Sequence, residues 1–257
     1  MPLSRAIVRV PGANFASGLT SAALGVPQLD TALEQHRLYC EALQQCGLKV
    51  RALNAESAYP DGTFIEDTAV IAAPLAITTR PGAASRAGEV RSIRAALADY
   101  ELDLHEIEAP GTLDGGDVCL AEKHFFIGIS RRTNEEGARQ LAALVHSCGY
   151  RSSIIDVRQS RSLLHLKSGI AYLGEGRVAV VAELSHSPQL AGYELVHTPA
   201  GEEYAANCVR INEHVLIAAD HSRFAATLAE LGYRLLPLAM SEFRKMDGGL
   251  SCLSLRF

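Results

Sequence analysis

The stretch LDTALEQHRLYCEALQQCGLKVRAL, residues 29–53, combines a helix pattern with a strand pattern. Over residues 29–46 the apolar side chains recur at the spacing of one helical face, and Asp30 and Thr31 are helix-start signals. Gly47 is a stop signal, and residues 48–53 then alternate as a half-buried strand does. The stretch therefore predicts an amphipathic helix, a break and a short strand.

This arrangement occurs five times along the chain. The strand centres lie at Val50, Leu104, Ile154, Leu195 and Leu235, so successive centres are separated by 54, 50, 41 and 40 positions. Paired apolar runs lie between the copies, and the fourth copy has only a short, degenerate helix. A repeat of this length with three strands and a helix indicates a five-bladed α/β propeller of ββαβ repeats, in which residues 1–257 form one domain. The alternative is an α/β sandwich with coincidental spacing.

Two local features add detail to this prediction. The third copy opens with Thr133 and Glu136, which are spaced as a capping box at a helix start. The last apolar segment contains Cys252, and in a C-terminal strand this cysteine would ordinarily be a core residue.

Composition limits the class of protein. The chain is 48% hydrophobic and 21% charged, which is ordinary for a globular protein. A net charge of −5 argues against a nucleic-acid partner. The N-terminal residues lack the pattern of a signal peptide, and no apolar run approaches membrane-spanning length, so a cytoplasmic location without membrane contact is expected. The six cysteines show no metal-binding or disulfide spacing, so we expect no metal.

Polar residues cluster at one point of each repeat, just before a strand begins. Because equivalent positions of a radial repeat lie at one end of its axis, we expect these residues to converge in a cup-shaped site. Each residue taken alone has an ordinary explanation: an acidic turn former, an interior histidine, a buried cysteine. Together, a thiol beside a histidine forms an activated nucleophile, and carboxylates match the N–H fork of a guanidinium. The residues concerned are Asp61, Glu66, Asp67, Asp114, Asp117, His165, Asn207 and Cys252.

Several motifs resemble the dimethylarginine dimethylaminohydrolase family, in order and over nearly the whole chain. The resemblance implies the five-bladed α/β propeller (pentein) fold of the guanidine-modifying superfamily. It also implies a hydrolase without cofactor or metal that converts Nω-methylated and asymmetric Nω,Nω-dimethylated arginine to citrulline and methylamine or dimethylamine. The motifs are FIED at 64–67, TTRPGA at 78–83, LDGGD at 113–117, SRRTN at 130–134, LHLK at 164–167, AANC at 205–208 and KMDGG at 245–249.

The resemblance also implies roles for three catalytic residues. Cys252 would be the nucleophile and His165 the general acid and base. Asp114 would bind and polarise the guanidinium. Some bacterial relatives have Glu at this position, so the carboxylate of this chain extends one methylene less far.

Further positions would bind the substrate by the same resemblance. Asp67, with Glu66 nearby, would contact the guanidinium. The α-carboxylate would be clamped by Arg86 and Arg132. The α-amino group would be received by Asp61 and by the backbone near Leu19 and Met246, and residues 18–21 resemble the lid loop of the family.

Three alternatives remain. An arginine deiminase would use the same chemistry on free arginine, but such enzymes usually carry an inserted helical domain for which 257 residues leave no room. An amidinotransferase would need an amine-acceptor site, which we do not find in the sequence. A non-catalytic propeller scaffold has no reason to combine a cysteine, a histidine and carboxylates at matching positions. The expected partner is a small molecule, and a monomer or a homodimer is expected.

Overall fold

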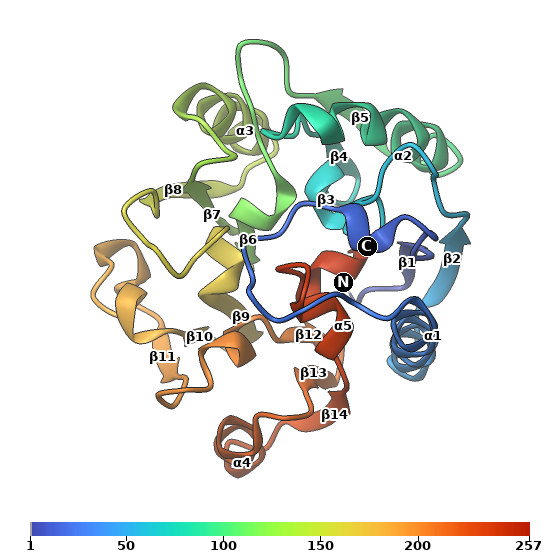
Figure 1. Ribbon diagram of the computed structural model, residues 1–257. Helices are drawn as coiled ribbons and strands as arrows, with labels where there is room; N and C mark the ends of the chain where they lie inside the picture. The colour runs from blue at the N-terminus through green and yellow to red at the C-terminus, as the bar shows by residue number, and fades with distance from the viewer. Residues whose placement is uncertain (1) are drawn as a thin grey trace. The chain divides into compact units, whose positions relative to one another are not determined.

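The computed structural model describes residues 2–257, and within them the chain forms five three-stranded sheets (Figure 1). These sheets fall into two compact units. The first unit comprises the chain up to Ile65 together with Thr198–Phe257, and the second is Glu66–His197. The five repeats predicted from the sequence are therefore confirmed, with two sheets in the first unit and three in the second.

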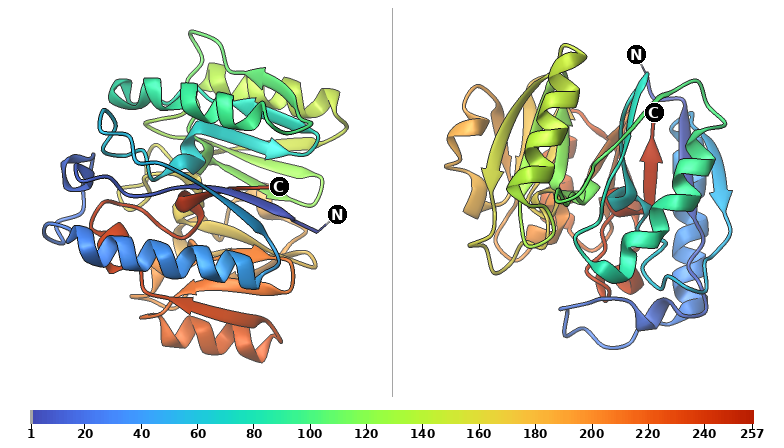
Figure 2. Two further views of the ribbon diagram at one scale, coloured as in Figure 1. Left: turned by 90° about the vertical axis from the view of Figure 1, so that its right-hand side faces the viewer. Right: turned by 90° about the horizontal axis from the view of Figure 1, so that it is seen from above.

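The first unit contains the sheets β15-β1-β2 and β12-β13-β14. The last strand, β15, pairs antiparallel with β1, so residues from the two ends of the chain complete one sheet; Figure 2 shows these red and blue strands side by side. The strands are β1 (Arg5–Arg9), β2 (Lys49–Leu53), β12 (Val209–Ile211), β13 (His214–Ala218), β14 (Arg234–Leu238) and β15 (Ser254–Arg256), and the helices are α1 (Leu29–Gln45), α4 (Ser222–Glu230) and α5 (Ser241–Arg244).

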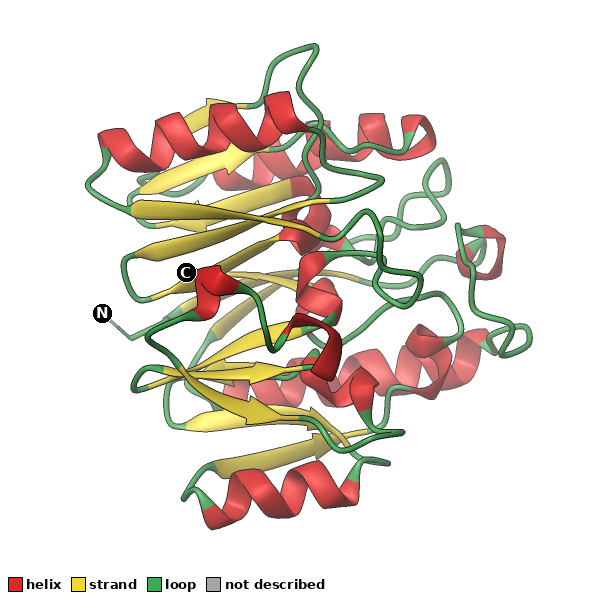
Figure 3. Cartoon of the chain, turned by 90° about the vertical axis from the view of Figure 1, so that its left-hand side faces the viewer, coloured by secondary structure: helices red, strands yellow, loops and turns green. Residues whose placement is uncertain are grey.

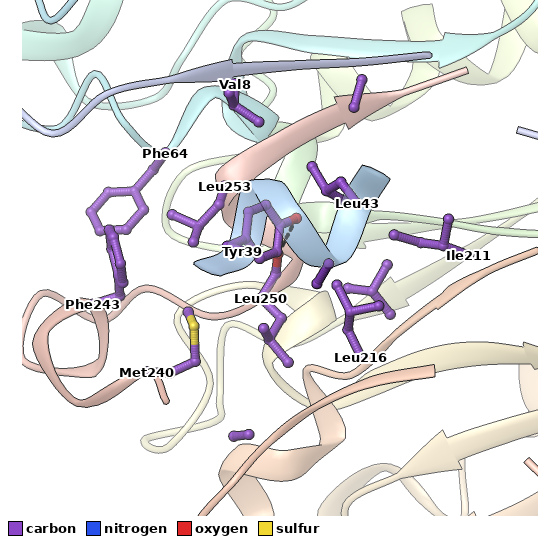
Figure 4. Close-up of a cluster of buried hydrophobic side chains, with 14 of the residues drawn as sticks. Val8, Tyr39, Leu43, Phe64, Ile211, Leu216, Met240, Phe243, Leu250 and Leu253 are labelled. Atoms are coloured by element: carbon purple, nitrogen blue, oxygen red, sulfur yellow. Dashed lines mark hydrogen bonds between the residues drawn. The ribbon is translucent and has the colours of Figure 1, made fainter. Parts of the chain in front are cut away.

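The core of the first unit forms where helix α1 meets the sheets (Figure 4). Tyr39 is fully buried, and its hydroxyl donates to the carbonyl of Leu250 at 2.9 Å and lies 2.7 Å from Ser254 Oγ. Cys252 packs against the same cluster while remaining partly exposed. The core therefore fixes the segment on both sides of this cysteine.

The second unit repeats the pattern three times. In the last repeat the helix is replaced by two short 3-10 turns, Ala182–Leu184 and Pro188–Leu190, which agrees with the degenerate fourth copy of the sequence pattern. The strands are β3 (Ala69–Ala72), β4 (Leu75–Thr78), β5 (Asp103–Glu106), β6 (Val118–Ala121), β7 (His124–Ile129), β8 (Arg151–Asp156), β9 (Ile170–Gly174), β10 (Arg177–Val180) and β11 (Glu194–His197), and the helices are α2 (Val90–Leu97) and α3 (Glu135–Ser147).

All five sheets share one topology, and Figure 3 shows the resulting alternation of strands and helical segments. One edge strand runs antiparallel to the central strand, and the central strand is parallel to the other edge strand. A short 3-10 turn precedes the antiparallel edge strand of every sheet. These turns are Ile65–Thr68, Gly115–Asp117, Leu166–Ser168, Glu203–Ala206 and Ser251–Leu253.

Two local predictions are wrong. Cys252 was expected in a C-terminal strand but lies in the 3-10 turn that precedes β15. Helix α3 is capped by Asn134, whose side chain accepts a hydrogen bond from Gly137 N, and not by Thr133. The Thr133 hydroxyl is engaged elsewhere, as described below. In the part of the chain that the structure describes, no helix combines the length and apolarity needed to cross a bilayer.

Candidate active site

The centre of the site in the second unit is a hydrogen-bonded pair, Asp114 and His165. Each residue lies immediately before a 3-10 turn, Gly115–Asp117 for the aspartate and Leu166–Ser168 for the histidine. His165 Nε2 lies 3.0 Å from Asp114 Oδ2, and both side chains are buried. The second carboxylate oxygen of Asp114 accepts a hydrogen bond from Gly82 N at 2.8 Å. The turns therefore hold an acid–base pair in a low-dielectric environment.

Charge in this region favours a protonated imidazole. Burial alone would lower the pKa of His165, but the charges of Asp67 and Asp117 and the hydrogen bond to Asp114 outweigh it and raise the pKa to about 9. Burial would likewise raise the pKa of Asp114, yet the hydrogen bond and charge of His165 and the charge of Arg86 lower it. At neutral pH the pair is therefore an imidazolium beside a carboxylate.

Asp67 belongs to a second buried ion pair. Its Oδ2 accepts from an Arg86 guanidinium nitrogen at 2.5 Å, and its Oδ1 accepts from Gly116 N at 2.9 Å. Arg86 also donates to both carboxylate oxygens of Glu89, at 3.0 and 3.2 Å from Nε and at 2.8 Å from Nη2. Glu89 was not predicted as a site residue, although its position three residues after Arg86 in a helical segment is a signal for such a pair.

The two remaining predicted residues of the second unit are Glu66, which has an ion-pair partner, and Arg132, whose guanidinium has none among residues 2–257. Glu66 forms an ion pair with Lys167, which follows His165 by two positions. Arg132 is partly exposed, and its guanidinium has no hydrogen-bond or ion-pair partner among residues 2–257. The backbone N–H of Arg132 donates to Ser130 Oγ at 3.0 Å, which fixes its main chain while leaving its side chain available.

The LDGGD motif needs its glycines for close packing. A Cβ atom on Gly115 would lie 2.0 Å from the carbonyl oxygen of Glu66, and one on Gly116 would lie 2.9 Å from the His165 ring. Only a residue without a side chain fits at these distances. The paired glycines therefore allow the carboxylate-bearing segments and the histidine to approach one another.

The described residues 2–257 contain one cluster of metal-ligand type, Asp67, Asp114 and His165, whose ligand atoms lie within 4.8 Å of one another. However, the two carboxylates already accept hydrogen bonds from Arg86, Gly82 and Gly116. A histidine protonated on both nitrogens offers no lone pair to a metal. In this structure the three side chains take part in an ion-pair network.

In the first unit, Cys252 lies in a turn fixed by polar contacts. Its Sγ accepts a hydrogen bond from Gly249 N at 3.4 Å. The Asn207 side chain accepts from Ser251 N at 2.9 Å and donates to Ser251 Oγ at 3.0 Å. The Tyr204 hydroxyl donates to the Gly248 carbonyl at 2.8 Å. A backbone N–H directed at the sulfur stabilises a thiolate, and the surrounding contacts hold the sulfur in place.

A second group in the first unit surrounds residues 18–21. The buried Asp61 carboxylate accepts from Leu19 N at 2.9 Å, and the side chain of Met246 lies against Gly18. Asp247 accepts from Ser21 N at 2.5 Å and from Ser21 Oγ at 3.0 Å. The structure therefore brings Leu19, Asp61 and Met246 together, as the resemblance implied, and adds Asp247, whose contact with residue 21 was not predicted.

Within each unit, most of the predicted residues are neighbours. Asp67, Asp114, His165 and Arg86 form one buried network, with the Glu66–Lys167 pair beside it in the sequence. In the first unit Cys252 has its own turn, and Leu19, Asp61 and Met246 lie around residues 18–21. The roles of all these residues toward a substrate stay predictions. The first unit supplies a thiol, and the second unit supplies a protonated imidazole and buried carboxylates; these are the groups that covalent chemistry on a cationic amidine requires.

Comparison with known proteins gives consistent matches. A family model described as arginine deiminase matches residues 95–191. The N(G),N(G)-dimethylarginine dimethylaminohydrolase of Pseudomonas aeruginosa is 41% identical over 252 residues, which cover 98% of each chain.

Two solved structures are similar over the whole chain. One is the P. aeruginosa dimethylarginine dimethylaminohydrolase with a cysteine-to-serine substitution, complexed with citrulline; it is 40% identical, covers 100% of each chain and has a TM-score of 0.96. The other is a dimethylarginine dimethylaminohydrolase with a histidine-to-glycine substitution, as an adduct with S-methyl-L-thiocitrulline. It is 40% identical, covers 99% of this chain and 100% of its own, and has a TM-score of 0.95. With the five repeats, these matches confirm the five-bladed α/β propeller fold class.

Proposed function

Because this chain belongs to the N(G),N(G)-dimethylarginine dimethylaminohydrolase family, we propose that it hydrolyses Nω-methylated and asymmetric Nω,Nω-dimethylated arginine. The products are citrulline and methylamine or dimethylamine. The observation that most supports the proposal is the buried His165–Asp114 pair, with its 3.0 Å hydrogen bond and a histidine pKa raised to about 9. An amine leaves readily only when it is protonated, and this pair keeps a proton available at neutral pH.

The first half-reaction forms a covalent intermediate. The Cys252 thiolate attacks the guanidinium carbon, and a carbon–sulfur bond forms. His165 transfers its proton to the methylated nitrogen, whose bond to carbon breaks, and the neutral amine leaves. The result is an S-alkylthiouronium on Cys252 and a neutral imidazole. The hydrogen bond from Gly249 N to the sulfur supports the thiolate, because an N–H donor stabilises the charged form.

The second half-reaction uses water. Neutral His165 takes one proton from a water molecule as its oxygen attacks the thiouronium carbon. The carbon–sulfur bond then breaks, the thiolate returns and citrulline is released. A second proton, from the oxygen that becomes the carbonyl, passes to solvent, where the released amine is protonated. No oxidant, reductant or metal is needed for this sequence.

The proposal assigns substrate contacts to the residues around these groups. Asp114 and Asp67 offer carboxylate oxygens to the guanidinium, with Glu66 nearby. The Arg132 guanidinium, which lacks a protein partner among residues 2–257, suits the α-carboxylate, and Arg86 assists it. The α-amino group is assigned to Asp61 and to the backbone near Leu19 and Met246, which lie together around residues 18–21.

Some finer points belong to the same proposal. Because Cys252 and His165 are proposed to act in one reaction, residues 1–257 are proposed to form a single catalytic domain. We propose a cytoplasmic enzyme that acts without cofactor or metal as a monomer or homodimer, with a small-molecule substrate and no nucleic-acid or membrane partner. The net charge of −5 is compatible with a cationic substrate.

Citrulline release tests the proposal directly. The substrates are asymmetric dimethylarginine, monomethylarginine, symmetric dimethylarginine and free arginine, and the proteins are wild type, Cys252→Ser and Cys148→Ser. Cys148 is an exposed cysteine and provides the matched control. We expect turnover of the monomethyl and asymmetric dimethyl compounds, a loss of about 10³-fold or more in Cys252→Ser, and none in Cys148→Ser. Preferential turnover of free arginine would instead indicate a deiminase, and citrulline formation by Cys252→Ser would exclude this nucleophile.

A further inference from the structure

Asp117, the second aspartate of the LDGGD motif, is a fully buried carboxylate for which the reaction above has no use. It accepts hydrogen bonds from Ser130 Oγ at 2.6 Å, Thr133 Oγ1 at 2.7 Å and Leu166 N at 2.9 Å. Burial of a carboxylate is costly unless its oxygens are hydrogen-bonded. Ser130 and Thr133 belong to one segment of the second unit and Leu166 to another, so the carboxylate connects these two segments.

One of these hydrogen bonds leads to Asp114. The Thr133 hydroxyl donates to Asp117 Oδ2, and the same oxygen of Thr133 accepts from Asp114 N at 3.1 Å. Asp117 N also donates to the Asp114 carbonyl at 3.0 Å. The main chain of Asp114 is thus fixed from both sides. This engagement explains why Thr133 does not cap helix α3, although its sequence position predicted a cap.

Another hydrogen bond leads to His165. Asp117 Oδ1 accepts from the backbone N–H of Leu166, the residue directly after the histidine. Strand β7 passes close behind this contact, since a Cβ on Gly128 would lie 2.9 Å from Asp117 Oδ1 and 2.8 Å from Leu166 Cβ. Asp117 Oδ1 therefore fixes the main chain next to His165, while Asp117 Oδ2 fixes the main chain of Asp114 through the Thr133 hydroxyl.

From this connectivity we propose that Asp117 is a positioning residue, which sets the distance and orientation of the Asp114–His165 pair through Thr133 on one side and the Leu166 N–H on the other. The inference rests on the proposed function insofar as that function assigns His165 the acid–base role. Asp117 also contributes negative charge near the ring, together with Asp67 and Asp114, the other carboxylates that face His165. Burial raises the pKa of Asp117, the charge of His165 and the hydrogen bonds from Ser130 and Thr133 oppose the rise, and the resulting pKa is about 6.

Asp117→Asn is the first variant, because it keeps the size of the side chain. The oxygen that accepted from Thr133 is replaced by an amide nitrogen that cannot accept, and the negative charge is lost. We expect kcat for the methylated substrate to fall by about 10- to 100-fold with little change in KM, because a small displacement of an acid–base group affects the transition state most. The alkaline limb of the kcat–pH profile should move to lower pH.

Thr133→Val and Thr133→Ser form a matched pair that does not alter Asp117. Valine has nearly the shape of threonine but neither donates to Asp117 nor accepts from Asp114 N, whereas serine retains both hydrogen bonds. We expect Thr133→Val to reduce kcat and Thr133→Ser to recover most of the loss. Equal kcat values for the two variants would overturn the connection through the hydroxyl.

A readout independent of catalysis separates this inference from the proposed function. The imidazole resonances of His165, assigned with His165→Gly, are titrated by NMR in wild type and in Asp117→Asn. We expect the midpoint to move to lower pH by about one pH unit in Asp117→Asn, since a nearby negative charge has been removed. Such a shift supports the positioning role even if the substrate proves to be different. An unchanged His165 titration and kcat–pH profile, with only a lower melting temperature, would reduce Asp117 to a structural residue and overturn the proposal.

Discussion

Replacement of His165 by glutamine is expected to remove a contribution to folding that depends strongly on pH. In the folded chain Asp67, Asp117 and Asp114 raise the pKa of His165 to about 9 against the desolvation of the ring, whereas a histidine of the unfolded chain has a pKa near 6.5. Because the folded value is raised, the stabilisation is complete below about pH 6.5 and is lost as the pH rises through about 9. At about 1.36 kcal/mol per pKa unit, the difference between the folded and the unfolded pKa of His165 corresponds to about 3 kcal/mol of stability.

The assay is urea unfolding of wild type and His165→Gln at about pH 6 and about pH 10, followed by circular dichroism. The free energy of unfolding of wild type relative to the variant should be larger at the lower pH by about 3 kcal/mol. His186→Gln, which alters an exposed histidine, provides the control and should show no such change. The reasoning is refuted if the difference between wild type and His165→Gln is the same at both pH values or greater in alkali. The titrating proton is shared with Asp114, so the value belongs to the pair.

Three further predictions concern other parts of the site. Asn207→Ala removes two hydrogen bonds to Ser251, in the turn that contains Cys252. This variant should lower kcat about tenfold and slow alkylation by iodoacetamide, with KM nearly unchanged; a change in KM alone would contradict this. Gly115→Ala should lower the free energy of unfolding by about 1–3 kcal/mol, measured by urea unfolding, because its Cβ would lie 2.0 Å from the Glu66 carbonyl. Asp247→Gly can keep the left-handed backbone of this residue, at φ 58°, but removes the side chain that accepts hydrogen bonds from Ser21. Steady-state kinetics should show a KM raised a few-fold. An unchanged KM would exclude a substrate-binding role for the contact between residues 247 and 21.

The repeat pattern was readable from the sequence because hydrophobic periodicity reports which side chains are buried. Residues 29–46 were expected to be helical, and α1 spans Leu29–Gln45. The polar segments before each strand were located correctly because they interrupt this periodicity. The 3-10 turns that they form were not predicted, since such short turns leave no periodic signal.

Hydrogen-bond partners were much harder to predict, because a residue type specifies what it can donate or accept but not to whom. Thr133 matched a capping pattern, yet its hydroxyl joins Asp117 to Asp114 N. Glu89 was not singled out, although it pairs with Arg86 in the buried network. These choices depend on tertiary contacts between segments that are distant in sequence.

The pairing of β15 with β1 has a consequence for how the chain is synthesised. The second unit is continuous in sequence, so all of its segments leave the ribosome before any of Thr198–Phe257, the C-terminal part of the first unit. By contrast, β1 emerges first and acquires its antiparallel partner last, and Cys252 belongs to the turn that leads into that partner. This edge of the nascent β1 strand therefore stays unpaired until residues 254–256 have been synthesised, and an unpaired strand edge is prone to mispairing. Because Cys252 lies two positions before β15 begins, a chain that stops before residue 252 lacks the thiol and the strand together.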